Sequence, residues 1–347
     1  MSELVLKPEL VDDYLKSLGR LPQSTSTTVS ELGGGVSNRV LKVTWDGQCI
    51  VMKQPLPNLD VQDDWPADTE RIHNEAMAAR EYRRIVHKYD ISGVNAPNVV
   101  FEDEANDIAA FEYVAADDTW KARLLAGEVD QNIAAKVGEA LGTIHAVAAQ
   151  NEELAASFSS DKPMEQLRIN PYHRTVAQRH PELANKIESE ITRLMTIKRT
   201  LVHGDYSPKN ILISERGDGG SAIWIIDFEV ASWGDPAFDP AFLLNHLFIK
   251  SIYNRTKQEA YIRAAFRFWD GYQAQTDWNI ELDVLSELAI LMLARIDGKS
   301  PVEYIDNPAV ADALRNVGAT SLATGTDTIT EFADLIRSKT EQISEEE

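Results

Sequence analysis

Residues 203–210 read His203-Gly204-Asp205-Tyr206-Ser207-Pro208-Lys209-Asn210, and residues 225–229 read Ile225-Ile226-Asp227-Phe228-Glu229. Asp205 and Asn210 share one loop between short β-type runs, and Asp227 follows the next apolar run. A carboxylate in such a loop can orient a hydroxyl group and accept its proton. An amide oxygen and a second carboxylate are hard ligands of the kind that Mg²⁺ binds. The pattern therefore predicts Asp205 as the catalytic residue and Asn210 and Asp227 as metal ligands, with Glu229 within reach of a second ion.

The residues around these segments divide into two parts. Short runs rich in Val, Ile, Thr and Trp cover residues 27–32, 39–45, 48–54, 98–102 and 108–114, with one long helical pattern from Asp68, as its cap, to about residue 89. After residue 117, apolar residues recur at helical spacing over 131–149, 181–198 and 240 to about 336. These patterns predict an α+β fold, with a β-rich N-lobe over residues 1–115 and a mostly helical C-lobe over residues 116–347. A ligand is expected in a cleft between the lobes.

The loop and the later Asp also carry a family resemblance. Asp-x-x-x-x-Asn followed by a metal-binding Asp is the spacing of protein kinases. The whole string is more similar to the aminoglycoside phosphotransferase and choline kinase superfamily, because Gly204 and Glu229 stand where protein kinases have Arg and Gly. The segment Gly234-Asp235-Pro236-Ala237-Phe238-Asp239 also resembles that superfamily, which implies that Asp239 is a structural acid bracing the catalytic loop. The resemblance covers about residues 27–300 and implies a protein-kinase-like fold with ATP and Mg²⁺ as cofactors.

A nucleotide site is expected in the N-lobe. The glycines of Gly33-Gly34-Gly35 allow the backbone to approach phosphates closely, and Ser37 and Asn38 can donate hydrogen bonds to them. No Lys follows the glycines, so this is not a Walker A motif. The run is a weak signal by itself, and it gains weight from the motif around Asp205.

Further nucleotide contacts are predicted on the strands that follow. Lys53 lies where a kinase lysine meets the α- and β-phosphates. Glu75 and Glu81 of the long helix are both suitable partners, and Glu75 is preferred because Arg71-x-x-x-Glu75 resembles the family pattern. Residues 111–114 are expected to lead into the hinge between the lobes, where backbone groups of Glu112 and Val114 would face adenine.

Substrate residues are expected in the helical lobe. Residues 167–174 concentrate cationic and hydrogen-bonding side chains in an acidic protein, and predict substrate contacts by Arg168, Tyr172, His173 and Arg174. Arg295 belongs to a second basic segment, residues 293–299. Surface ion pairs, or pairing with a helix C-terminus, are the alternative interpretation of these cations. His145 and His246 occur in apolar helices and are expected to be structural groups in the core or near the site.

A narrower resemblance concerns the substrate. Lys53-Gln54-Pro55-Leu56-Pro57, then Asp64-Trp65-Pro66 and the helix with Arg71 and Glu75, are similar to methylthioribose kinases, which phosphorylate a ribose derivative. Asn210 and Phe228 depart from that pattern, because those enzymes have another residue and Pro at the two positions. The expected substrate is therefore a pentose or pentose phosphate, with methylthioribose as one candidate.

Composition limits the partners. The chain has 347 residues, with 34 basic and 55 acidic side chains and a net charge of −21, which repels nucleic acids and anionic membranes. Its longest apolar run near the C-terminus, residues 288–294, is far shorter than the roughly 20 residues of a membrane span, and the first residues lack the apolar stretch of a signal peptide. A single cysteine, Cys49, excludes an internal disulfide and fits the cytoplasm. The acidity can reflect solubility or a high-salt host, and a homodimer is left open.

Together these features predict an ATP-dependent kinase that phosphorylates a hydroxyl of a ribose-type sugar or sugar phosphate. Aminoglycosides, choline and other amino alcohols are the alternative substrates. An inactive nucleotide-binding scaffold is disfavoured because Asp205, Asp227 and Lys53 are all present. A protein kinase is disfavoured because Glu229 replaces the Gly of Asp-Phe-Gly and no activation-segment signature is found.

Overall fold

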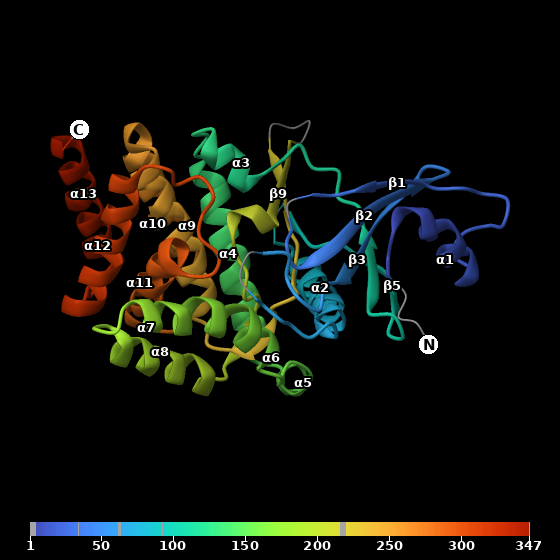
Figure 1. Cartoon of the computed structure of the whole chain (residues 1–347), viewed down its shortest axis with the longest axis horizontal. Helices are drawn as coiled ribbons and strands as arrows, with labels where there is room; N and C mark the ends of the chain where they lie inside the picture. Colours follow the sequence, from blue (N-terminus) through green and yellow to red (C-terminus); the bar gives the residue numbers. More distant parts are fainter. Residues whose placement is uncertain (1–4, 34, 62–63, 92, 216–219, 347) are drawn as a thin grey trace.

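The computed structural model describes residues 5–33, 35–61, 64–91, 93–215 and 220–346, with side chains described as far as residue 343 (Figure 1). Within these ranges a β-rich lobe, on the right of Figure 1, adjoins a helical lobe on the left. The predicted α+β, two-lobe architecture is therefore confirmed. None of the helices in these ranges combines the length and apolar character needed to cross a membrane.

The N-lobe is built on an antiparallel sheet with strand order β1-β2-β3-β6-β5. The strands are β1 (Thr28–Glu31), β2 (Asn38–Trp45), β3 (Gln48–Pro55), β5 (Val99–Asp103) and β6 (Ile108–Glu112). Alternate side chains point to opposite faces of the sheet. Ile50 and Met52 pack in a cluster with residues of α1 (Val11–Ser17), which follows the short helix η1 (Pro8–Leu10), whereas Phe111 of β6 packs with the long helix α2 (Arg71–Lys88).

The start of α2 differs from the prediction. The helix begins at Arg71, and the cap position is Glu70, which makes no side-chain capping bond. The carboxylate of Asp68 instead pairs with Lys162 of the C-lobe at 2.8 Å. The prediction that Asp68 caps this helix is therefore wrong, because a contact between the lobes occupies its side chain.

Small sheets lie where the two lobes meet. One has the order β4-β10-β9-β7, and the other pairs β11 with β8. Their strands are β4 (Val94–Asn95), β7 (Asp118–Thr119), β8 (Thr200–Val202), β9 (Ile211–Glu215), β10 (Ser221–Ile225) and β11 (Ser232–Gly234). β4 pairs parallel with β10, so a strand from before residue 115 joins the sheet that carries the Asp227 segment. The lobe boundary near residue 115 stays a prediction.

The C-lobe is mainly helical. Its longer helices are α4 (Gln131–Ala148), α8 (Ala184–Thr196), α9 (Phe238–Tyr253), α10 (Gln258–Gln273), α11 (Glu281–Asp297), α12 (Pro308–Thr324) and α13 (Ile329–Glu346). The shorter ones are α3 (Trp120–Leu125), α5 (Glu152–Ser157), α6 (Lys162–Met164), a π-helix η2 (Glu165–Arg174), α7 (Thr175–Arg179), η3 (Pro208–Asn210) and η4 (Arg255–Lys257). Three helices predicted from periodicity, over 131–149, 181–198 and from 240 onward, all have counterparts here.

Helices α4 and α10 approach each other closely at glycines. A Cβ added at Gly138 would lie 2.0 Å from the backbone oxygen of Phe268, and one at Gly271 would lie 2.4 Å from that of Ala135. Both neighbours are backbone atoms, which cannot turn aside as a flexible side chain can. The pairing of α4 with α10 therefore requires residues without a side chain at these positions.

We expect Gly138→Ala to destabilise the protein by about 1–3 kcal/mol, because overpacking outweighs the roughly 1 kcal/mol that Ala gains over Gly in helix propensity. Denaturant unfolding measures the free-energy difference. The control is Glu139→Ala, on the exposed side of the same helix. Equal stability of Gly138→Ala and wild type would show that α4 and α10 can move apart at no cost.

Candidate active site

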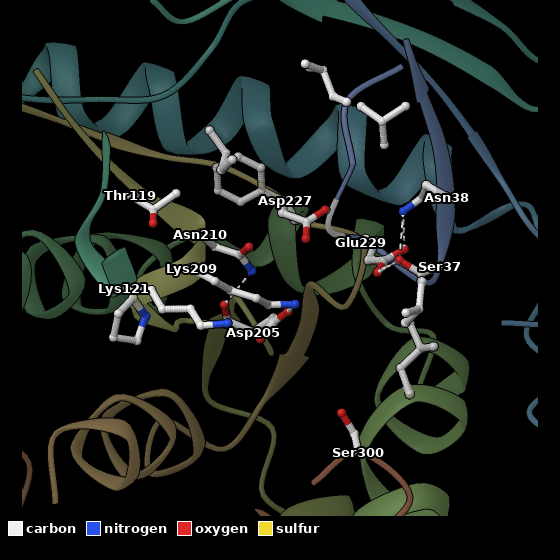
Figure 2. A pocket seen from close by; sticks show the side chains of 18 of the residues that line it. Ser37, Asn38, Thr119, Lys121, Asp205, Lys209, Asn210, Asp227, Glu229 and Ser300 are labelled. Carbon is white, nitrogen blue, oxygen red and sulfur yellow. Dashed lines mark hydrogen bonds and ion pairs between the residues drawn. The ribbon is translucent and has the colours of Figure 1, made fainter. Parts of the chain in front are cut away.

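A cavity of about 870 Å³ lies between the lobes. The N-lobe contributes Lys53, Glu75 and the described residues of the segment 33–38, which we call the glycine segment. The C-lobe contributes residues of the loop 203–210, which is the predicted catalytic loop, together with Asp227 and parts of α9 and α11. Figure 2 shows Asp205, Lys209 and Asn210 on one side of this space, with Asp227 next to them and Glu229 directed toward Ser37 and Asn38. The cavity thus brings together segments that are far apart in the sequence.

Lys53 joins the two lobes through carboxylates. Its Nζ lies 2.6 Å from Oε1 of Glu75 on α2 and 2.7 Å from Oδ1 of Asp227. Burial disfavours the ammonium, but the charges of Asp227 and Glu75 outweigh burial and raise the pKa of Lys53. Burial likewise opposes ionisation of Asp227, but Lys53 and Lys209 together outweigh burial and lower the pKa of Asp227. Lys53 is therefore a cation, and Asp227 a carboxylate, at neutral pH, and the choice of Glu75 over Glu81 agrees with the geometry.

The glycine segment is held by Glu229. Ser37 Oγ donates to Oε1 of Glu229 at 2.7 Å, and Asn38 Nδ2 donates to Oε2 at 2.9 Å. Arg71 Nε donates to the same Oε2 at 3.1 Å, and its Nη2 donates to the carbonyl of Ser37 at 2.6 Å. Glu229 therefore holds the segment against the C-lobe. Its contact with a second ion stays a prediction, and to make that contact Glu229 would have to give up these hydrogen bonds.

The remaining nucleotide predictions lie around the same end of the cavity. Gly33 and Gly35 line it, as do Glu112 and Val114 in the predicted hinge. Gly34 is outside the described residues. None of the described residues accepts a hydrogen bond from the Val114 N–H, which is one of the backbone groups expected to face adenine.

Asp205 is held by two cations on one of its oxygens. Arg168 Nη2 lies 3.1 Å, and Lys209 Nζ 3.0 Å, from Oδ2. Burial opposes ionisation, but Lys209 and Arg168 outweigh it and lower the pKa of Asp205. The other oxygen, Oδ1, accepts no hydrogen bond from another described residue, and both closest cation contacts are made by Oδ2. Asp205 therefore presents a free, ionised oxygen in a cavity that it lines.

Asn210 and Asp227 offer oxygen ligands beside this carboxylate. Asn210 Nδ2 donates to the carbonyl of Asp205 at 3.0 Å, which fixes the amide and leaves its oxygen as an acceptor. Asp227 adopts a left-handed backbone conformation, with a φ of 71°, which is strained for a residue other than glycine. The described residues contain no group of three or more His, Cys, Asp or Glu side chains placed to hold a metal ion. This donor set fits Mg²⁺, which is usually held by one or two carboxylates together with phosphate oxygens and water.

Asp239, which is fully buried, supports the catalytic loop through hydrogen bonds to its backbone. Its Oδ2 accepts from the backbone N–H of His203 at 2.7 Å, and its Oδ1 accepts from that of Gly204 at 2.9 Å. Gly204 has a φ of 75°, and a Cβ there would lie 2.5 Å from Cγ1 of Val230. His145 also lies 3.2 Å from Oδ2, so one of the two histidines expected to be structural does support this loop.

Arg168 lies on the π-helix η2, which contains Pro171. Each carbonyl of a π-helix accepts from the N–H five residues further along, so Pro171, which has no N–H, leaves the carbonyl of Gln166 without its helical bond. That carbonyl accepts instead from Trp65 Nε1 at 2.9 Å, which connects the N-lobe to the C-lobe. Arg168 Nη1 donates to the carbonyl of Leu167, the residue before it, at 2.6 Å.

The structure brings only part of the predicted substrate set to the cavity. Arg168, Tyr172 and Arg295 line it. His173 does not line it: its Nε2 lies 3.0 Å from both carboxylate oxygens of Glu287, and both side chains are fully buried. Arg174 points to the surface, where it pairs with Glu165 at 3.0 Å. Neighbours in sequence therefore diverge, because successive residues of a helix face different directions.

Several cavity residues were not predicted from the sequence. Phe242 and Lys250 of α9 line the cavity together with His246, which lies between them at a spacing of four, and so does Lys121 of α3. Lys250 was overlooked because it lies in an otherwise apolar helix, although a lone Lys among buried residues is itself a signal. His246, expected to be structural, lies at the cavity wall.

We compared the chain with known proteins. The family model of the phosphotransferase enzyme family matches residues 28–277. Methylthioribose kinase of Bacillus pumilus (strain SAFR-032) is 24% identical over 263 residues, covering 68% of this chain and 64% of that protein. Methylthioribose kinase of Bacillus cereus (strain AH187) is 21% identical over 365 residues, covering 91% and 90%. The chain thus spans less than two thirds of the length of the Bacillus pumilus enzyme.

Among solved structures, the GDP and kanamycin complex of APH(2")-IIia aligns with a TM-score of 0.52 at 14% identity, covering 97% of this chain and 99% of that chain. This likeness supports the predicted protein-kinase-like fold. Because the family model matches more than half of the chain, the protein belongs to the phosphotransferase enzyme family. The predicted enzyme class, a phosphotransferase, is confirmed.

We expect Asp239→Asn to destabilise the protein by about 1–3 kcal/mol and to lower turnover, because an amide has one acceptor oxygen for two backbone donors and adds a buried N–H₂ group. Thermal or denaturant unfolding and steady-state kinetics measure the two effects. Asp312→Asn is the matched control, since Asp312 belongs to an exposed ion pair. Wild-type stability of Asp239→Asn would rule out the bracing role.

Proposed function

We propose that this phosphotransferase transfers the γ-phosphoryl group of ATP, with Mg²⁺, to a hydroxyl of a ribose-type sugar or sugar phosphate. The observation that carries the proposal is the free oxygen of Asp205 in the cavity that also holds Lys53, Asn210 and Asp227. The relatives named methylthioribose kinase support a ribose-type acceptor.

Each residue has a part in the transfer. Lys53 and the backbone of the glycine segment bind phosphate oxygens, and Asn210 and Asp227 would hold Mg²⁺, which neutralises charge on the phosphates when bound. Asp205 Oδ1 orients the acceptor hydroxyl and accepts its proton as the new O–P bond forms and the bond to ADP breaks. The low pKa of Asp205 makes it a weak base, so orientation is the larger part of its role.

Two other acceptor classes fit the cavity less well. A polycationic aminoglycoside would meet Lys209, Lys250 and Arg295. A choline site needs open aromatic faces. Here Arg168 lies 5.5 Å from the ring centre of Tyr172, and Lys250 lies 5.0 Å from that of Tyr304, so cations of the protein already occupy these faces.

The proposed reaction uses ATP, and we infer that it takes place in the cytoplasm. The free Cys49 fits a reducing compartment. Nucleic acids and membranes are not proposed as partners, and a homodimer stays a prediction.

ATP turnover with a panel of hydroxyl compounds tests the function. The panel contains ribose, methylthioribose, ribose phosphates, kanamycin and choline, each with Mg²⁺. Turnover with a ribose compound well above the others is the expected result. Preference for kanamycin or choline would overturn the proposed acceptor class.

Asp205→Asn should lower kcat by roughly 10²–10⁴-fold while ATP still binds, because the variant keeps the size of the side chain but loses the charge that orients the acceptor hydroxyl and accepts its proton. Single-turnover transfer and calorimetric ATP binding separate the two effects. Asp161→Asn, at a surface ion pair with Lys198, is the control. Near-normal transfer by the Asp205 variant would reject this assignment.

Asp227→Ala should abolish the part of ATP binding that depends on Mg²⁺, because it removes the carboxylate expected to hold the ion. Calorimetry with and without Mg²⁺ measures this difference. An unchanged Mg²⁺ dependence would mean that another residue holds the metal.

A further inference from the structure

The C-lobe end of the cavity is cationic although the protein as a whole is acidic. The chain has a net charge of −21. The described C-lobe carboxylates that line the cavity are those of Asp205, Asp227, Glu229 and Glu303, of which Asp227 and Glu229 pair with Lys53 and Arg71 of the N-lobe. The C-lobe cations that line it are Lys121, Arg168, Lys209, Lys250, Arg295 and Lys299. Among these C-lobe residues, positive charge therefore exceeds negative charge.

Four of these cations are accounted for by contacts with the protein. Asp205 pairs with Arg168 and Lys209, Glu303 pairs with Lys121, and Lys299 donates to the carbonyl of Asp64 at 2.9 Å. Lys250 and Arg295 remain, and within the described ranges neither has a carboxylate partner.

Lys250 is the unusual member of the set. It is only 1% exposed, and its Nζ donates to the hydroxyl of Tyr304 at 3.2 Å. A buried ammonium without a counter-ion is costly. Accordingly, burial and the positive charges of Lys121 and Arg295 outweigh the opposing charge of Glu303 and lower the pKa of Lys250 to about 7. Such a side chain destabilises the ligand-free protein. Its presence is explained if a bound ligand supplies the missing negative charge.

Arg295 is also incompletely satisfied. Its Nη1 donates to the hydroxyls of Tyr172 and Ser300, each at 3.1 Å, while its buried Nε has no hydrogen-bond partner among the described residues. A guanidinium held by neutral hydroxyl groups keeps its full charge and is oriented to bind an anion.

The pKa of His246 is sensitive to the charge at this end of the cavity. It lies one turn before Lys250 on α9 and lines the same cavity. Burial, and then the charges of Lys250, Arg295, Lys209 and Lys121, lower the pKa of His246 well below its ordinary value. Tyr172 responds in the same direction: burial raises its pKa, but Arg295 and Arg168 outweigh burial and lower it. Two groups on different helices thus experience an excess of positive charge.

The geometry points to an anion-binding subsite formed by Lys250 and Arg295, which binds a phosphate monoester carried by the acceptor. The inference rests on the proposed kinase function and narrows it: the substrate is a phosphorylated pentose rather than a neutral sugar. A phosphate matches two cations from α9 and α11, because it carries up to two charges and can accept hydrogen bonds from both. The subsite shares a cavity with Asp205, so the acceptor would present its hydroxyl to Asp205 and its phosphate to Lys250 and Arg295.

Steady-state kinetics with Mg²⁺ and ATP test the subsite on ribose, ribose 1-phosphate, ribose 5-phosphate and ribonate. Wild type should use a ribose phosphate better than ribose. Lys250→Met should lower kcat/KM for the phosphate by roughly ten- to hundredfold, the effect expected for a hydrogen bond to a charged group, and leave ribose within about twofold. Arg295→Gln should also lower kcat/KM for the phosphate. The control is Lys198→Met, which removes the same charge at a surface ion pair outside the cavity.

Stability provides a second readout. Lys250→Met should raise the unfolding midpoint of the ligand-free protein, because it removes a buried cation whose neighbours, Tyr304 and, at longer range, the charge of Glu303, do not offset its burial. Loss of a merely structural Lys would lower the midpoint. The gain should be largest below pH 7, where Lys250 is charged in both states, and should shrink as the pH rises toward 10. A lower midpoint for Lys250→Met would contradict the subsite.

Inorganic phosphate separates this inference from the kinase function. Lys53→Met removes the cation at the nucleotide end, so this variant should bind inorganic phosphate at the subsite alone. Calorimetry measures that binding, and the double variant Lys53→Met/Lys250→Met should lose it. If no acceptor is phosphorylated, the kinase proposal fails, and this titration still decides the subsite. If ribose is used as well as its phosphates, if ribonate is preferred, or if phosphate binding is unaffected by Lys250→Met, the subsite is refuted while the kinase function stands.

Discussion

The ion pairs of Lys53 connect the two lobes, and the cavity depends on them. Glu75 comes from the N-lobe helix and Asp227 from the C-lobe, and each lies within 2.7 Å of the same ammonium. Buried charges are stable only when they are paired, so removing one partner would leave the others uncompensated. The same contact places the strand of Lys53 opposite Asp227 before any nucleotide arrives. Phosphates that enter this site would exchange contacts with charges that are already in place, which limits the reorganisation that binding requires.

A second connection between the lobes controls the glycine segment. Arg71 and Glu229 form a buried ion pair at 3.1 Å, and both also bind the segment around Ser37. Glycines by themselves make a backbone free to move. Here Glu229, two residues after Asp227, fixes the end of the segment, so the segment proposed to bind phosphates and the residue proposed to hold the metal are positioned by the same short stretch of the C-lobe.

The cations at the C-lobe end of the cavity contrast with the acidity of the whole molecule. A surface with a net charge of −21 repels anions at long range, but screening limits that effect to roughly 8–10 Å at physiological ionic strength. An anion that entered the cavity would lie close to these cations, so their charge would act on it more strongly than the distant surface. The same cations lie over the aromatic rings of Tyr172, Phe242 and Tyr304, which gives those rings a role in holding charge.

Local sequence was sufficient for the two-lobe architecture and for bringing Asp205, Asn210 and Asp227 together. Asp205 and Asn210 share one short loop, and Asp227 follows a strand that pairs with the strand after that loop, so their proximity follows from short-range connections. Lys53 and Glu75 could be paired because a strand and the helix after it pack together. The divergence of His173 and Arg174 from Arg168 was decided by the π-helix and its packing. The ion pair between Arg71 and Glu229 and the position of Lys250 at the cavity wall were likewise decided by tertiary structure. These features join segments separated by many residues, and the direction of each side chain depends on which helices pack around it, which spacing along the chain does not specify.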